Sequence, residues 1–367
     1  MQHSTNYHRL MLQLGVWAVG VADVLGETGP KAMMEKLAKA THWLTSLLDE
    51  DSGQTPNLGH NDGAYILPLS ILPCEDYRPV LQAASRAFLG NAALKAGIWD
   101  EMALWFGQAK TKKAGDKRVA ENQILRLEGK DSWAYFRVAH FNERPGHADQ
   151  LHVDLWWRGL NIAQDAGSYL YTGRAPWDNA LASTRVHNTV TANDKEQMRR
   201  AGRFLWLDWA QGKVISIQRT KDRKLVSASA SHDGYRHLGV IHQREVSTEA
   251  LRWVVTDHLS QIGKTTKILQ ASLHWLLPDW PWQLDTQELR IKSPKGSVEI
   301  SIGVSVGDNY ELQVVRAGEL LHGSGPAEAF LGWTSPTYGV KLPALSFIVD
   351  LHGKPPLTIA STFTLPR

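Results

Sequence analysis

The chain has 367 residues, of which 43% are hydrophobic, and this length exceeds what a single core comfortably organises, so we expect a globular protein of two domains. A net charge of +3 without a dense basic run argues against a nucleic-acid-binding protein, and no apolar run is long enough to cross a membrane. The single cysteine, Cys74, excludes an internal disulfide framework.

The N-terminal part of the chain has the apolar spacing of helices. A first helix is predicted after a cap at Ser4 or Thr5, and Pro30 can start the next one. Two more are predicted over residues 79–88 and 99–106. Helices that follow one another through loops favour an α/α layer architecture.

The pattern changes at a charged, glycine-containing segment, residues 110–117, which we interpret as a linker. It separates a helical domain, residues 1–112, from a second domain, residues 118–367, in which short apolar runs alternate with turn signals. These runs predict a large antiparallel β-sandwich domain. The clearest of them are residues 214–217, 225–230, 252–257, 268–277, 298–306 and 345–351.

One stretch of the second domain follows a Pro-Gly turn and alternates in polarity. Gln150, His152 and Asp154 lie between apolar residues, and this period of two predicts a strand with one buried face. A turn at Arg158-Gly159 leads into a second predicted strand, residues 160–163.

Polar residues stand where these strands end. Asp165 follows the second strand at a glycine-bounded corner, and His187 starts a further strand. Two histidines and a carboxylate at strand ends can converge on one ion, with the nitrogen and oxygen ligands that zinc prefers. Three hydrogen-bonded polar residues in a β-rich domain would have the same spacing, so the spacing alone supports both interpretations.

A resemblance to the heparinase II/III-like family of polysaccharide lyases rests on three motifs in order: Gly146-His-Ala-Asp, Asp165-Ala-Gly-Ser-Tyr and Val186-His-Asn-Thr-Val. The opening Ser4-Thr-Asn-Tyr-His-Arg and the loop Gly59-His-Asn-Asp-Gly also resemble short motifs of that family's helical domain. The matches run from the N-terminus to the middle of the second domain.

The resemblance implies a partial α/α toroid followed by a large antiparallel β-sandwich domain, with the active cleft between them. Such enzymes cleave polysaccharides that contain uronic acid by β-elimination. A tyrosine of the helical domain serves as base, acid or both. A divalent metal, commonly zinc, binds in the β domain.

Carried over by position, the resemblance assigns roles to single residues. Tyr7 matches the catalytic tyrosine, and His147, Asp165 and His187 match the metal ligands. A tyrosine acts as a base near neutral pH only if neighbouring cations lower its pKa. Asn188 can orient His187, reach the substrate or start the following strand.

One position departs from the family pattern. Many relatives have a catalytic histidine two residues before the position of His147, where this chain has Pro145, which cannot titrate. We expect Arg144 to take over this role, because its guanidinium is always charged and can clamp a carboxylate. The other candidates are His8, His60 and His140.

Several further residues are weaker candidates. Asn61 and Asp62 are predicted, with His60, to bind substrate hydroxyls, although an Asx turn explains the first two better. Asp149 is expected to hydrogen-bond the loop of His147, as metal histidines require.

Aromatic and basic residues of the second domain have two interpretations each. The tryptophans can stack on sugars or pack in the core, and the basic group faces an anionic polymer or solvent. The residues are Trp156, Trp157, Trp177, Trp206 and Trp209, and Lys195, Arg199, Arg200 and Arg203.

We therefore predict a lyase acting on an acidic polysaccharide or oligosaccharide, without nucleic-acid or membrane partners and with its oligomeric state open. The alternatives are a toroid-type glycoside hydrolase using Asp62 with Glu101, and a catalytically degenerate carbohydrate-binding protein. The small helical part further suggests a truncated or reduced N-terminal domain. No signal-peptide pattern is visible, which predicts a cytoplasmic protein if Met1 is the true start and a periplasmic or secreted one otherwise.

Overall fold

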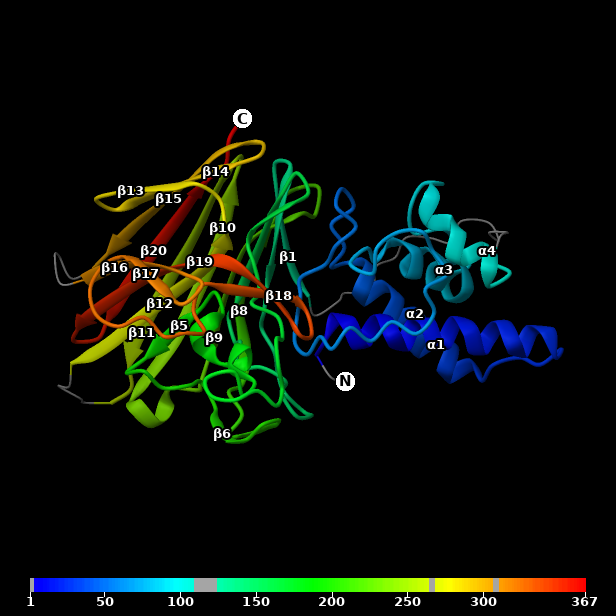
Figure 1. Ribbon diagram of the computed structural model, residues 1–367, viewed down its shortest axis with the longest axis horizontal. Helices are drawn as coiled ribbons and strands as arrows, with labels where there is room; N and C mark the ends of the chain where they lie inside the picture. The colour runs from blue at the N-terminus through cyan, green and yellow to red at the C-terminus, as the bar shows by residue number, and fades with distance from the viewer. Residues whose placement is uncertain (1–2, 109–123, 264–267, 306–309) are drawn as a thin grey trace. The chain divides into compact units, whose positions relative to one another are not determined.

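The computed structural model describes residues 3–108, 124–263, 268–305 and 310–367. The chain divides into two compact units, a helical unit, Gln2–Ile124, and a β unit, Leu125–Arg367 (Figure 1). The predicted linker, residues 110–117, lies outside the described residues. No helix in the described part of the chain is long and apolar enough to cross a membrane.

The helical unit contains the four predicted helices. They are α1 (Thr5–Val24), α2 (Lys31–Thr45), α3 (Arg78–Leu89) and α4 (Glu101–Trp105), the last preceded by the short 3₁₀ helix η1 (Ile98–Asp100). The predicted cap is confirmed, because the Ser4 side chain accepts a hydrogen bond from the Tyr7 amide at 3.1 Å. Apolar faces of the helices form one core around Leu12, Leu44 and Leu81. The toroid that the resemblance implies stays a prediction.

The β unit consists of antiparallel sheets, as predicted. A four-stranded sheet has the order β1-β2-β3-β4, an eight-stranded sheet β13-β14-β15-β20-β11-β10-β9-β8, and a six-stranded sheet β17-β16-β19-β12-β5, with β18 also paired to β19. A hairpin, β6-β7, stands apart. Their bounds are β1 Leu125–Gly129, β2 Ser132–Phe136, β3 Val153–Trp157, β4 Leu160–Ala163, β5 Val190–Ala192, β6 Arg199–Gly202, β7 Leu205–Leu207, β8 Gly212–Arg219, β9 Leu225–His232, β10 Val240–Glu249, β11 Arg252–Gln261, β12 Leu269–Pro278, β13 Trp282–Asp285, β14 Glu288–Ser293, β15 Gly296–Val304, β16 Tyr310–Arg316, β17 Glu319–His322, β18 Trp333–Thr337, β19 Val340–Gly353 and β20 Leu357–Thr364.

One hydrophobic core joins the three larger sheets. Phe136 of the four-stranded sheet, Trp253 of the eight-stranded sheet and Trp275 of the six-stranded sheet are all within 1% of complete burial and belong to the same apolar cluster. In strands such as β14 and β15, alternate residues face this cluster, which is the packing that a sandwich requires.

The prediction of one buried face for the stretch around β3 was wrong. Gln150, His152 and Asp154, on the expected solvent face, are at most 1% exposed. The segment that begins at His187 covers them: the Asn188 amide donates to His152 Nδ1 at 3.0 Å, and the Thr189 hydroxyl donates to the Gln150 carbonyl at 2.8 Å. Periodicity shows which residues share a face, but a distant segment decides whether that face meets water.

A chain of neutral histidines is buried beside strands β9, β10 and β11. The Gly234 amide donates to His232 Nδ1 at 3.1 Å, so the neutral His232 ring carries its proton on Nε2. That nitrogen lies 3.1 Å from His242 Nδ1, and His242 Nε2 lies 2.6 Å from Asp257 Oδ1. His232 therefore donates to His242, and His242 donates to the Asp257 carboxylate, where the chain ends.

Burial lowers the pKa of His232 well below its ordinary value, with His242 and Arg244 acting in the same direction. Burial also lowers the pKa of His242, although Asp257 opposes this shift. The pKa of Asp257 is about 2, because Arg244 and His242 outweigh the burial that would raise it.

We expect the β unit to lose stability on acidification. Both histidines bind fewer protons in the folded than in the unfolded chain, so unfolding takes up protons below the unfolded pKa of about 6.5, at ~1.4 kcal/mol per pH unit for each ring. Asp257 adds stability above about pH 4 that is lost as the pH falls towards 2. Urea unfolding at several pH values checks this. Replacing His232 by Gln should flatten the dependence between about pH 6.5 and 5, whereas the exposed control His237→Gln should leave it unchanged.

Candidate functional site

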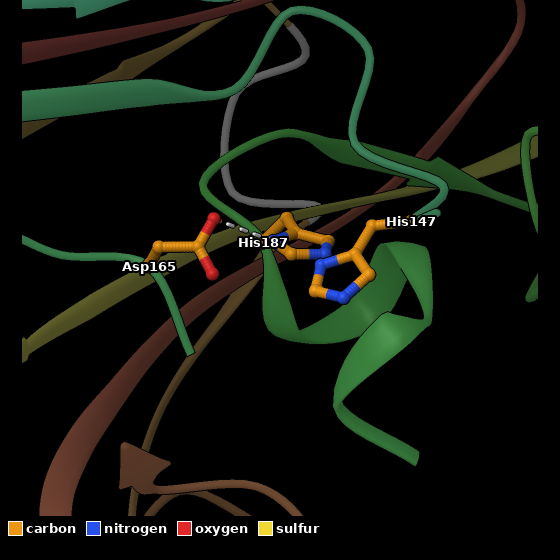
Figure 2. Close-up of side chains that lie close together, drawn as sticks. All are labelled: His147, Asp165 and His187. Carbon is orange, nitrogen blue, oxygen red and sulfur yellow. Dashed lines mark ion pairs between the residues drawn. The ribbon is translucent and has the colours of Figure 1, made fainter. Parts of the chain in front are cut away.

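Three side chains of the β unit converge in its interior. His147 precedes β3, Asp165 follows β4, and His187 lies between a 3₁₀ turn, η3 (Thr184–Val186), and β5. All three are buried, and one donor atom of each lies within 4.8 Å of the others. Figure 2 shows Asp165 on one side of His187 and the ring of His147 on the other. The sequence prediction that these residues meet is thus seen in the geometry.

The backbone around Asp165 explains how its carboxylate is aimed. Oδ1 accepts a hydrogen bond from the Gly167 amide at 2.8 Å, and Gly167 has φ of +73°, which favours glycine. Oδ2 is left facing the histidines, 3.4 Å from His187 Nδ1. The ring centroids of His147 and His187 are 5.2 Å apart.

The donor set fits a divalent cation. Among the described residues, Asp165 Oδ2 and both ring nitrogens of His187 are buried and make no hydrogen bond of normal geometry. Each such atom costs about 1–3 kcal/mol unless a proton or ion satisfies it. Two imidazole nitrogens and one carboxylate oxygen are a common set for zinc.

His152 supports this cluster, and the sequence did not single it out. Its Nδ1 accepts the Asn188 amide, so its neutral ring carries a proton on Nε2. That atom lies 3.7 Å from Asp165 Oδ2 and 3.7 Å from Asp154 Oδ2. Burial lowers the pKa of His152 to about 4, which keeps the ring neutral. Its place in the polar alternation of residues 150–154 was the available signal.

The surroundings shift the pKa values of Asp165, His187 and Asp154 in different directions. Burial favours a high pKa for Asp165, but His187, followed by the other histidines, holds that pKa below its ordinary value. Burial lowers the pKa of His187, yet the charge of Asp165 raises it overall. Burial, followed by the charge of Asp165, raises the pKa of Asp154 well above its ordinary value. These opposite shifts favour the anionic form of Asp165 and the protonated form of Asp154.

The Asn188 side chain forms three hydrogen bonds with backbone groups. Its Nδ2 donates to the Val153 carbonyl at 2.8 Å and to the Gln164 carbonyl at 3.1 Å, and its Oδ1 accepts the Leu276 amide at 2.6 Å. The side chain is fully buried. Of the alternatives that the sequence left open, these contacts favour orientation of the His187 segment. Substrate binding would require the amide to leave all three partners.

The loop before His147 holds the predicted replacements for the family histidine. Arg144 is exposed and forms no ion pair with a described carboxylate, whereas Pro145 is buried. His140 is exposed and lines a cavity of about 470 Å³ together with Lys213 and Arg236. Arg144 is therefore available to a ligand without first losing a partner.

Asp149 forms a buried ion pair that the sequence did not suggest. Its Oδ1 lies 2.7 Å from Arg137 Nε, and the expected hydrogen bond to the loop of His147 stays a prediction. The pKa of Arg137 is correspondingly raised despite the burial that opposes it.

A second set of predicted residues meets in the helical unit. The loop of residues 56–64 lies on the first turn of α1: the Thr5 amide donates to the Leu58 carbonyl at 3.1 Å, and the Ala64 amide donates to Asn6 Oδ1 at 3.2 Å. In this arrangement the Tyr7 hydroxyl donates to Asp62 Oδ2. Two motifs separated by about fifty residues therefore form one site.

Among the described residues of the helical unit, no cation lowers the pKa of Tyr7. Burial, the hydrogen bond to Asp62 and the charge of that carboxylate raise the pKa of Tyr7 to about 12. The expectation of a cation-activated tyrosinate therefore does not match this site. A protonated tyrosine paired with a carboxylate is instead suited to donate or relay a proton.

The neighbours of Tyr7 have structural contacts. His8 is 5% exposed, its Nε2 lies 2.9 Å from the Ala40 carbonyl, and its ring lies against Trp43. A catalytic role would require this ring to leave the helix packing. Asn61 Oδ1 accepts the Gly63 amide at 3.1 Å, which is the Asx turn. His60 is partly exposed in the same loop.

Most tryptophans that the sequence offered as sugar platforms are core residues. Trp156, Trp157 and Trp206 are at most 1% exposed, so packing is confirmed for them. Trp177 and Trp209 are partly exposed. Arg199 and Arg200 lie on β6, whose residues are all exposed.

Comparison with known proteins shows which family the chain resembles. The sequence profile described as "Heparinase II/III-like, C-terminal" matches residues 111–362. None of the curated proteins compared with the chain matches it. Solved structures supply the further comparison.

The chain is similar in fold to a heparinase III described as the BT4657 gene product, with a TM-score of 0.68 and 15% identity over 98% of this chain and 51% of that one. It is also similar to the heparan sulfate lyase HepC from Pedobacter heparinus, with a TM-score of 0.67 and 17% identity over 100% of this chain and 53% of that one. The chain thus spans about half the length of these proteins, and at such identities the likeness shows the fold alone. Because the profile match covers most of the sequence, the chain belongs to the heparinase II/III-like family.

Proposed function

We propose that this chain acts in the β-elimination of an acidic polysaccharide or oligosaccharide that contains uronic acid. The observation that carries this proposal is the hydrogen bond from the Tyr7 hydroxyl to Asp62 on the first turn of α1. Family membership and the similar structures described as heparinase III and heparan sulfate lyase support the same chemistry.

The Tyr7–Asp62 pair can move the protons that this reaction requires. The phenol oxygen accepts the proton from C5 while its own proton passes to Asp62. The C4–O4 bond then breaks as the C4=C5 double bond forms, and Tyr7 delivers the proton to O4. Asp62 finally returns its proton to the tyrosinate, so the pair is restored and no water is consumed. The raised pKa of Tyr7, about 12, favours the protonated phenol, which is the form that delivers the proton to O4.

The carboxylate beside C5 must be neutralised for the carbanion-like charge to develop. We assign this function to Arg144, the exposed cation that stands next to Pro145. A guanidinium can hold a carboxylate with two parallel hydrogen bonds and keeps its charge at every working pH.

We also propose that His147, Asp165 and His187 bind a divalent metal, with zinc the best fit to their donor atoms. The ion would supply positive charge and join three separate segments of the β unit. The neutral ring of His152 lies beside this site, with Nε2 3.7 Å from Asp165 Oδ2. The oligomeric state and the compartment predicted from the sequence stay predictions.

The hydrolase alternative is less well supported. Its two carboxylates are engaged locally, Asp62 by Tyr7 and Glu101 by the Ile71 amide at 2.8 Å. A carbohydrate-binding protein without activity would use the same surfaces, so the products of incubation distinguish the three functions. A lyase forms an unsaturated uronide, a hydrolase forms a saturated reducing end, and a binding protein forms neither.

We expect Tyr7→Phe to lower kcat by about 10²–10⁴-fold, because the phenylalanine can neither accept nor deliver a proton. Asp62→Asn should also lower kcat by removing the relay. The measurement is the ultraviolet absorbance of the unsaturated product on heparan sulfate, hyaluronan, chondroitin and alginate. Tyr310→Phe, a partly exposed tyrosine of the β unit, is the matched control and should retain activity. A flat trace on every polymer from the folded wild type would reject the elimination.

We expect about one zinc per chain by elemental analysis, lost in His187→Ala and retained in the exposed control His237→Ala. Free zinc at about 100 times its Kd should stabilise the wild type by ~2.7 kcal/mol, seen as a higher Tm that a chelator reverses. Equal metal content and Tm in wild type and His187→Ala would refute the site. This test does not depend on activity.

A further inference from the structure

An aromatic box surrounds Lys341 near the start of β19. The Lys341 ammonium lies 3.6 Å from the ring centroid of Trp333 and 3.8 Å from that of Trp177, with Tyr169 at 5.4 Å. These three rings meet at steep angles, 84° between Tyr169 and Trp177 and 82° between Trp177 and Trp333. We call these four residues the lysine box. All of them are partly exposed, so a ligand can reach them.

The lysine has no counter-ion of its own. None of the described carboxylates lies within ion-pair distance of Lys341, although nearby arginines are paired. Burial against the rings lowers the pKa of Lys341 from its ordinary value. Ring faces attract an ammonium but leave its charge unneutralised. An anion that arrives at the box would therefore gain an ion pair without breaking one.

The charge around the lysine box favours an anion as well. Asp178 follows Trp177 directly, and it is shared by Arg200 at 3.9 Å and Arg203 at 3.1 Å. Asp178 thus has two cationic partners, and Lys341 adds a further positive charge at Trp177. Two residues of the basic group that the sequence left unassigned, Arg200 and Arg203, therefore pair with the residue next to Trp177.

Hydrogen bonds tie the lysine box to the segment that starts at Asp165. The Ser335 amide donates to the Ala166 carbonyl at 2.8 Å, and the Gly339 amide donates to the Tyr169 carbonyl at 2.8 Å. The Trp333 indole N–H donates to the Ala329 carbonyl at 3.1 Å, which fixes that ring. The box is therefore held on the same backbone as the metal cluster, and its rings lose little freedom when a ligand binds.

We propose that the lysine box is a binding subsite for an acidic sugar residue, with Lys341 pairing the carboxylate or sulfate and the indoles of Trp177 and Trp333 packing against the sugar ring. The chemistry is that of aromatic faces for the apolar C–H surface of a sugar and an ammonium for its negative charge. This inference rests on the proposed function for its class of substrate.

The test measures binding by isothermal titration to the full chain carrying Tyr7→Phe, so that no saccharide is cleaved. The probes are an N-sulfated heparan tetrasaccharide, an unsulfated heparosan tetrasaccharide and neutral chitotetraose. Lys341→Gln should weaken binding of the acidic probes about tenfold, the loss of one charge-assisted contact, and leave chitotetraose unchanged. Lys341→Arg should retain the affinity, and the exposed control Lys354→Gln should behave as the parent.

The outcomes separate the subsite from a packing role. A loss confined to the sulfated probe assigns a sulfate, and a loss for both acidic probes assigns the carboxylate. Unchanged affinity for the acidic probes in Lys341→Gln, or an equal loss for chitotetraose, overturns the proposal. Because cleavage is not measured, failure of elimination leaves this result valid. Conversely, an active wild type whose KM is unaffected by Lys341→Gln retains the proposed function and loses the subsite.

Discussion

The buried ion pair between Arg244 and Asp257 is the interaction on which the β unit depends. Two guanidinium nitrogens contact the carboxylate at 2.7 and 2.8 Å across neighbouring strands. A third donates to the carbonyls of Leu151 and Asn188, which belong to distant segments. Both charges are completely buried, so the loss of either would leave the other without a partner, at a cost of about 3–5 kcal/mol. The pair therefore joins the eight-stranded sheet to the backbone beside the candidate metal ligands.

This connection places the candidate metal ligands by successive hydrogen bonds. Arg244 holds the carbonyl of Asn188, whose side chain joins three backbone segments, and the Asn188 amide sets the tautomer of His152. His152 Nε2 lies 3.7 Å from Asp165 Oδ2, and the rings of His152 and His187 are neighbours, with their centroids 5.5 Å apart. Arg244, Asn188 and His152 are not among the candidate ligands themselves. They surround the ligands, and such neighbours influence which ligand atoms remain available to an ion.

The two proposed chemistries depend on different environments. In the helical unit Tyr7 is partly exposed and donates a hydrogen bond to the Asp62 carboxylate. This environment raises the pKa of the Tyr7 hydroxyl and so favours its protonated form. In the lysine box a cation is held on aromatic faces without a carboxylate among the described residues, which favours an incoming anion. An acidic saccharide suits both, because its reaction needs proton transfer and its recognition needs positive charge. The departure at Pro145 changes the neutralising group expected from the family, but leaves the histidine and carboxylate cluster complete.

The sequence by itself determined the local elements, because helix caps, apolar periods and turn residues act over a few positions. Ser4 predicted the start of α1, and the polarity of residues 150–157 predicted β3. Through the resemblance to the family it also named His147, Asp165 and His187, whose side chains converge in the structure. Only the tertiary structure decided that the polar face of β3 is buried, that Tyr7 meets Asp62, and that His152 lies beside Asp165. These outcomes depend on contacts between segments far apart in the chain, and neither spacing nor propensity carries information on which segment covers which.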